Sequence, residues 1–218
     1  MDSLDTRLEK QAPVIPFGPR DAGIPMDLDE FEAAEYEEGY RYELIHGVLV
    51  VTPSPLEEER DANEELGHWL RNYKESHPGG SALDLTLPEH NLRTVGQNRR
   101  PDRVLWVGLG RRPRTRGRPV SARDVPAIIV EFPASRPADQ RRDYVEKERE
   151  YQAIGVREYW IIDRFRRSMT VYSRDAGTWK KRVLGEGETY VTPELPGFEL
   201  PLKKLLHVMD AYRDEPEA

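Results

Sequence analysis

Two acidic residues and one lysine in the second half of the chain have the types and spacing that hydrolysis of a phosphodiester needs. Asp102 precedes an apolar segment, Glu131 ends the next one, and Lys147 lies in the charged stretch that follows. Two carboxylates from adjacent strands can chelate Mg²⁺, which prefers oxygen ligands and keeps several waters. Such a cation polarises a phosphoryl oxygen and lowers the pKa of bound water, while a nearby amine offsets developing charge. We therefore expect a metal-dependent phosphodiesterase site.

The expected ligands are all oxygen atoms, because the chain has no cysteine and thiolate sites are excluded. Asp102 and Glu131 are the predicted metal ligands, and the backbone carbonyl of Phe132 is the predicted third ligand. Magnesium is the expected cofactor, with manganese as the alternative. Lys147, on the helix that follows, is expected to orient the attacking water or to offset charge on the phosphorane.

Each of these residues also has a purely structural explanation. Asp102 follows a proline and could simply cap a turn. Lys147 could pair within its own helix with Asp143, four residues earlier. Glu131 follows three apolar residues at a predicted strand end, where an unpaired charge is costly, so it should have a cationic partner. The residues alone leave these alternatives open.

The elements that must position these residues follow from the apolar pattern. Short apolar or alternating runs predict strands at 42–51 (two, with a turn at Gly47), 82–87, 103–107, 125–132, 158–163, 169–172 and 179–184. Helices are predicted at 29–38, at 56–73, at 139–154 with a stop at Gly155, and at the end of segment 198–212. This order predicts an α/β fold, a mixed β-sheet flanked by helices.

Length and composition predict a single domain. The chain has 218 residues, of which 37% are hydrophobic, enough for one sizeable core. Residues 1–25 contain four prolines and are predicted to form an extended arm, residues 26–212 the domain, and residues 213–218 an acidic tail. Neither a membrane-spanning apolar run nor the apolar core of a signal peptide is present, so we expect a cytoplasmic protein with no membrane association.

Charge is distributed unevenly along the chain. The net charge of −7 argues against a nucleic-acid partner, because a uniformly acidic surface repels phosphate. Residues 27–38 hold seven acids and no base, whereas residues 99–118 hold eight arginines and one acid, Asp102. An acid inside a basic belt suits a site that grips phosphate around a metal. The alternative explanation is a solvated, proline-rich loop.

Several segments together resemble a known family. They are Arg41–Gly47, Arg100–Asp102, Ile129–Phe132, Asp143–Tyr151 and Gly155–Asp163. In this order they resemble the Uma-two family of restriction endonucleases, within the PD-(D/E)XK nuclease superfamily, over residues 31–179. The resemblance implies a restriction-endonuclease-like core, here with an added C-terminal β-hairpin, and magnesium-dependent DNA cleavage. It also implies catalytic roles for Asp102, Glu131 and Lys147, with Glu43 as an additional acidic ligand or water-holder.

The sequence departs from the superfamily pattern just after Glu131. Pro133 stands where the usual Glu-X-Lys triplet has its lysine, so Lys147 must supply the amine from the helix. Ala134 stands where the family often has serine.

Two functions from different classes are consistent with this sequence. The first is a magnesium-dependent endonuclease that cleaves DNA as a homodimer, with the hairpin 169–184 and the N-terminal arm as candidate dimer surfaces. The second is a catalytically inactive nuclease-like domain that serves as a nucleic-acid or protein interaction module. The acidic pair and Lys147 favour the first. The altered segment 133–136 and the acidic net charge favour the second.

Overall fold

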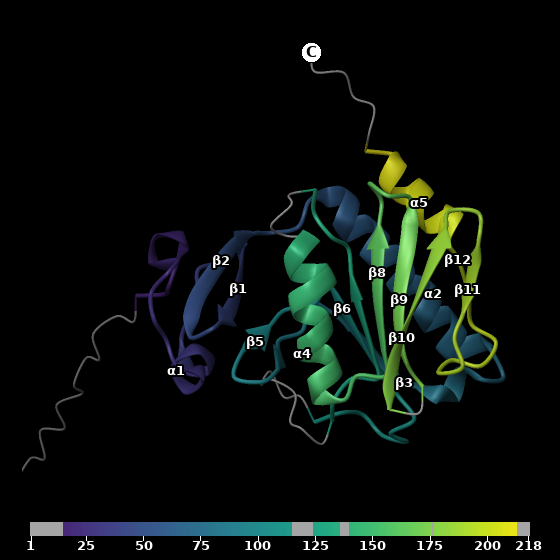
Figure 1. The fold of residues 1–218 in the computed structure, drawn as a ribbon, viewed down its shortest axis with the longest axis horizontal. Helices are drawn as coiled ribbons and strands as arrows, with labels where there is room; N and C mark the ends of the chain where they lie inside the picture. The colour runs from purple at the N-terminus through teal and green to yellow at the C-terminus, as the bar shows by residue number, and fades with distance from the viewer. Residues whose placement is uncertain (1–14, 115–123, 136–139, 176, 213–218) are drawn as a thin grey trace, which may run out of the picture.

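The fold is built on a six-stranded mixed β-sheet (Figure 1). The computed structural model describes residues 15–114, 124–135, 140–175 and 177–212. Its strands lie in the order β10-β9-β8-β7-β6-β3, in which β7 and β8 are parallel and all other neighbours are antiparallel. Their bounds are β3 (Leu83–Pro88), β6 (Arg103–Val107), β7 (Ile128–Glu131), β8 (Glu158–Asp163), β9 (Ser168–Asp175) and β10 (Thr178–Gly185). The predicted α/β class and the added hairpin, β9–β10, are confirmed.

Helices cover both faces of this sheet. The helices α2 (Glu57–Ser76) and α5 (Leu202–Asp210) lie on one face, and the π-helical turn η3 (Arg142–Glu146) with α4 (Lys147–Ile154) lies on the other (Figure 1). Side chains alternate between the faces, so Ile128 and Val130 pack toward α2 while Ile129 packs toward α4. A strand covered on both faces reads as a continuous apolar run, which explains the pattern at β7.

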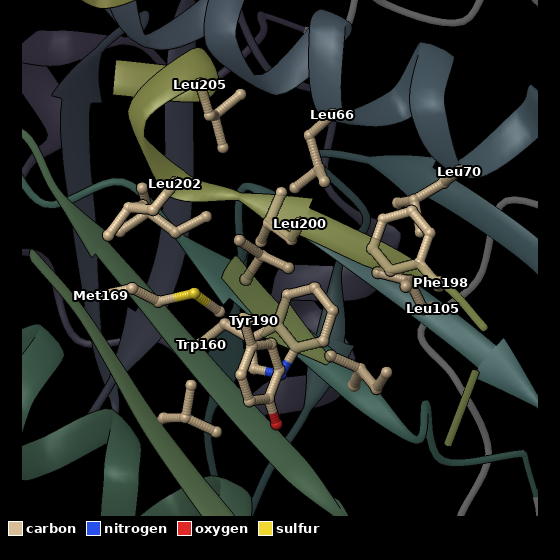
Figure 2. Close-up of a cluster of buried hydrophobic side chains, with 14 of the residues drawn as sticks. Leu66, Leu70, Leu105, Trp160, Met169, Tyr190, Phe198, Leu200, Leu202 and Leu205 are labelled. Atoms are coloured by element: carbon tan, nitrogen blue, oxygen red, sulfur yellow. The ribbon is translucent and has the colours of Figure 1, made fainter. Parts of the chain in front are cut away.

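The larger apolar core lies between the sheet and the α2–α5 pair. Figure 2 shows Leu66 and Leu70 of α2 and Leu205 of α5 packing with Trp160 and Met169 of the sheet. All five side chains are buried. This packing fixes the sheet as a rigid platform for the residues at the ends of β6 and β7.

A second, smaller sheet lies beside the first. It has the order β2-β1-β5-β4, from β1 (Tyr40–Ile45), β2 (Val48–Pro53), β4 (Leu92–Arg93) and β5 (Asn98–Arg99). Phe31 of α1 (Leu28–Ala33) packs with Tyr42, Leu44 and Leu49 in an apolar cluster of its own. Because β5 ends three residues before Asp102, this sheet delivers side chains to the same strand end. The remaining elements are η1 (Pro19–Asp21), η2 (Gly80–Ala82), β11 (Thr189–Val191) and β12 (Glu199–Pro201).

Some predicted boundaries were wrong. The helix predicted at 29–38 ends at Ala33, because Tyr36 instead forms a β-bridge with Phe17 and donates its hydroxyl to the carbonyl of Phe31. The strand predicted at 125–132 has regular pairing only over 128–131. The short strands β4, β5, β11 and β12 were not predicted, since two or three residues carry no measurable periodicity.

The two ends of the chain are described only in part. From residue 15 onward the predicted arm contacts the small sheet, through the bridge from Phe17 to Tyr36 and another from Pro25 to Val48. Residues 1–14 and the predicted acidic tail, 213–218, lie outside the described residues, and the domain boundaries remain a prediction. Within the described helices, none is long and apolar enough to cross a membrane.

Candidate active site

Asp102 and Glu131 come together at the ends of two adjacent strands. Arg103 of β6 pairs with Val130 of β7, and extending this antiparallel register by one residue places Asp102 opposite Glu131. The backbone amide of Phe132 donates a hydrogen bond of 2.7 Å to Oδ2 of Asp102. Both carboxylates are buried. The predicted convergence of these two acids is therefore present.

Lys147 lies between two carboxylates. Its Nζ is 2.9 Å from Oε1 of Glu131 and 2.9 Å from Oδ1 of Asp143. The hydroxyl of Tyr151 donates to the same Glu131 oxygen at 3.0 Å. All four side chains are buried. The pairing within the helix and the pairing with the strand end thus both occur, and Glu131 has the cationic partner that its burial requires.

The backbone around Lys147 explains how it reaches the sheet. The connection between two parallel strands must return across the sheet, so η3 and α4 lie over β7 and β8. The π-helical turn immediately precedes Lys147, and such turns occur often at functional sites. Gly155 ends the helix with φ +95°, a left-handed conformation that glycine adopts without a Cβ penalty.

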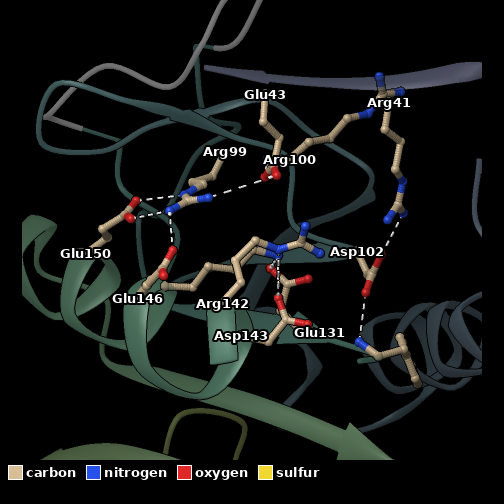
Figure 3. Close-up of polar contacts among 12 residues, drawn as sticks. Arg41, Glu43, Arg99, Arg100, Asp102, Glu131, Arg142, Asp143, Glu146 and Glu150 are labelled. Atoms are coloured by element: carbon tan, nitrogen blue, oxygen red, sulfur yellow. Dashed lines mark hydrogen bonds and ion pairs between the residues drawn. The ribbon is translucent and has the colours of Figure 1, made fainter. Parts of the chain in front are cut away.

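Arg41 of the small sheet contacts the other carboxylate. Its Nη2 lies 2.6 Å from Oδ1 of Asp102 (Figure 3). The same nitrogen lies 3.2 Å from Oε1 of Glu89. Arg100 contacts the second oxygen of Glu89 at 3.3 Å. Both oxygens of Asp102 therefore have donors, Arg41 on one and the amide of Phe132 on the other.

Glu43, the fourth predicted site residue, is buried at the edge of this network. Its Oε1 accepts the backbone amide of Arg100 at 2.9 Å, and its Oε2 lies 4.0 Å from Nη1 of Arg99. Arg99 is fully buried and also donates from Nε to Glu150 of α4 at 2.9 Å. Glu43 thus contacts two neighbouring arginines, one of which, Arg99, joins the small sheet to α4.

The charges of the site shift the pKa values in opposite directions. Burial alone would raise the pKa of Asp102, but Arg41, Lys147 and the Phe132 amide hold it below its usual range. The pKa of Glu43 is also lowered, because Lys147 and the arginines outweigh its burial. Burial raises the pKa of Glu131 to about 8, and Asp102 adds to the effect. The pKa of Lys147 is raised despite burial, since Asp143, Glu131 and Glu43 favour its charged form.

The donor set suits a hard divalent cation. Across the described part of the chain, no three His, Asp or Glu side chains are grouped so that they could hold a metal by themselves. Mg²⁺ is commonly bound by only one or two carboxylates, with waters and substrate phosphate completing the octahedron. Asp102 and Glu131 supply that pair at one place, and the Phe132 carbonyl belongs to the same strand end. Arg41 and Lys147 are the cations that now contact these carboxylates.

Sequence reasoning missed the residues that support this site from other elements. Asn63 of α2 donates to the carbonyl of Asp102 at 2.7 Å, and its own side-chain oxygen accepts from Arg103 at 2.6 Å. Arg103 and Arg99 belong to the predicted basic belt, yet both are fully buried. The signal for Arg103 was its position at the start of an apolar strand, where a solvated loop residue is not expected. The rest of the belt includes residues 115–123, which lie outside the described residues.

Comparisons with known proteins agree with this fold. A solved structure from Anabaena variabilis, described as "a putative nuclease belonging to DUF820", is similar with a TM-score of 0.66 and 18% sequence identity. The similarity covers 85% of this chain and 99% of that chain, and at this identity it shows a shared fold. No match was found among curated proteins. The model of the Uma2 family, described as "Putative restriction endonuclease", matches residues 28–203. Because this match spans most of the chain, the protein belongs to the Uma2 family.

Proposed function

We propose that this protein is a magnesium-dependent endonuclease that hydrolyses phosphodiester bonds of DNA. The observation that carries the proposal is the meeting of Asp102 and Glu131 at adjacent strand ends, with the ammonium of Lys147 at 2.9 Å from Glu131. Two acids and one amine are the groups that such a hydrolysis requires. Membership of a family described as "Putative restriction endonuclease" supports nucleic acid as the substrate.

The residues of the site have distinct roles in this proposal. Asp102, Glu131 and the carbonyl of Phe132 would hold the cation, for which manganese could substitute. When bound, the cation supplies polarisation of a phosphoryl oxygen and a water of lowered pKa. Two donors keep Asp102 in position: the backbone amide of Phe132, which binds its carboxylate, and the side-chain amide of Asn63, which binds its backbone carbonyl. Lys147 holds its charge next to Glu131, where it can orient the water and stabilise negative charge on the phosphorane.

Nicking of supercoiled plasmid tests the proposal. Asp102→Asn and Glu131→Gln each replace a carboxyl by an amide with little change in shape, and Asp175→Asn is the matched control on the exposed end of β9. We expect nicking that depends on Mg²⁺ or Mn²⁺, is unaffected in the control, and falls at least about a hundredfold in both site variants. Nicking that persists in both site variants would show that the site is wrongly assigned.

The alternative function predicts a different result in the same assay. If the folded protein binds DNA but nicks no plasmid with any divalent ion, it is an interaction module and the proposed hydrolysis is wrong. Far-UV circular dichroism of every variant establishes that the fold is retained. Sedimentation velocity on the same preparations tests the predicted homodimer.

A further inference from the structure

We propose that Arg41 neutralises Asp102 in the free protein. When a divalent cation binds, the guanidinium of Arg41 leaves Asp102 and contacts a phosphate of the substrate. The inference rests on the proposed function, because it takes Asp102 as a ligand of that cation. Its consequence is synergy: cation and phosphodiester should each bind more tightly in the presence of the other.

The two oxygens of Asp102 differ in what holds them. Oδ2 accepts the backbone amide of Phe132, a donor that belongs to the strand end and cannot leave. Oδ1 accepts from Arg41, whose side chain can move. Asp102 is buried, so a cation at Oδ1 would have to compete with the guanidinium for the same oxygen. Binding of the cation therefore includes the work of releasing Arg41.

Arg41 contacts a second carboxylate, that of Glu89, and has one buried N–H donor without a hydrogen-bond partner among the described residues. Its Nη2 lies 3.2 Å from Glu89, which gives the guanidinium a partner when it leaves Asp102. Its Nε is buried and has no hydrogen-bond partner among the described residues. A buried donor without a partner is costly, and a phosphate that accepts from Nε and one terminal nitrogen together would remove that cost.

The charges predict which of the two cations moves. Lys147 is held between Glu131 and Asp143, and its side chain is 4% exposed. Arg41 contacts its acids from the small sheet, and its side chain is 18% exposed. A divalent cation between them would repel both, and the more exposed Arg41 is free to turn toward solvent. A phosphodiester anion bound there would compensate the added charge.

Mn²⁺ binding tests this inference without measuring cleavage. Free Mn²⁺ is followed by electron paramagnetic resonance, with and without saturating dimethyl phosphate, the smallest phosphodiester. We expect dimethyl phosphate to tighten Mn²⁺ binding in the parent protein. Arg41→Gln should bind Mn²⁺ about tenfold or more tightly than the parent, because the competing charged contact is gone, and should lose the effect of dimethyl phosphate.

A second variant gives the opposite sign. Glu89 and Asp102 both contact Arg41, and Glu89→Gln removes the negative charge of Glu89. Arg41 should then stay on Asp102, and Mn²⁺ binding should weaken. A general folding defect cannot tighten binding in one variant and weaken it in the other. Mn²⁺ binding in Arg41→Gln that is no tighter than in the parent, or that still responds to dimethyl phosphate, overturns the inference.

Asp102→Asn separates this inference from the proposed function. If Mn²⁺ binding does not depend on Asp102, the metal site itself is wrong, and the proposed function and the role of Arg41 fail together. If binding is lost in Asp102→Asn but unchanged in Arg41→Gln, only the role of Arg41 is overturned. Asp175→Asn is the control in each titration.

Discussion

Replacing Lys147 with methionine removes the ammonium and keeps a side chain of similar volume. In the parent protein Nζ is 2.9 Å from both Glu131 and Asp143, and all three side chains are buried. Removing one partner of a buried ion pair costs about 3–5 kcal/mol, because the remaining charge is left uncompensated. Glu131 limits this loss, because its pKa of about 8 leaves the carboxyl mostly protonated at neutral pH, so the charge left uncompensated is mainly that of Asp143. We therefore expect a loss of about 3 kcal/mol in the free energy of unfolding at neutral pH, the low end of that range.

The pH dependence of this loss has a defined sign. A carboxyl whose pKa is raised in the folded state stabilises the fold below its unfolded pKa, and that contribution is lost as pH rises toward the folded value. In the parent protein the stabilising contribution of Glu131 is therefore fully lost once the pH reaches its folded pKa of about 8. Without Lys147 the pKa of Glu131 is higher still. The difference in the free energy of unfolding between parent and Lys147→Met should be constant below the parent's Glu131 pKa of about 8. Between that value and the variant's higher pKa it should grow by up to about 1.4 kcal/mol per pH unit.

Urea unfolding followed by tryptophan fluorescence measures both quantities, at one pH below the pKa of Glu131 and one above it. Lys180→Met is the matched control, because Lys180 contacts Asp175 at an exposed position where a pair contributes less than about 1 kcal/mol. At the pH above the pKa of Glu131, the double variant Lys147→Met with Glu131→Gln should recover part of the loss, since the neutral amide needs no cation. The reasoning is refuted if Lys147→Met loses no more stability than the control, or if the double variant recovers nothing.

Two further substitutions test other buried polar groups. Burial raises the pKa of Glu158, so Glu158→Gln should increase the melting temperature at alkaline pH, where the parent must ionise a buried carboxyl, and have little effect at acidic pH. An equal shift at both pH values in thermal melts would contradict this. Gly67→Ala would place a Cβ 2.5 Å from the buried guanidinium of Arg103 and should cost about 1–3 kcal/mol in urea titrations. Gly187→Ala, with open space around it, is the control, and equal stability of the two variants would disprove the packing argument.

The sequence predicted the fold and the meeting of the two acids because both depend on the sheet. A continuous apolar run such as Ile128–Val130 is compatible with a strand covered on both faces, and consecutive strands usually pair. Asp102 directly precedes one such strand and Glu131 ends the next, so antiparallel pairing brings them to the same end. Lys147 followed from the helix that must connect β7 to β8. The positions are therefore as predicted, while the catalytic and metal-binding roles remain predictions.

The sequence could not predict the partners that come from the small sheet. Arg41 and Asp102 are 61 residues apart and meet because of a sheet whose strands β4 and β5 have two residues each. Strands this short have no periodicity that a sequence can show. For the same reason the contact of Glu43 with Arg99 was not predicted, and the role of Glu43 as an additional acidic ligand or water-holder remains a prediction.

Charged side chains of the small sheet reach the site, which makes the site sensitive to the placement of this sheet. The apolar cluster around Phe31 is separate from the two clusters that cover the main sheet, although Leu92 of β4 packs in the cluster beside α4. Ionic contacts also cross between the two sheets: Arg41 to Asp102, and Arg99 to Glu150 of α4. A shift of this sheet would move Arg41 away from Asp102, while Lys147, held by elements of the main sheet, would keep its place. The two cations of the site therefore differ in what controls them, and only the contact of Arg41 depends on how the small sheet is docked.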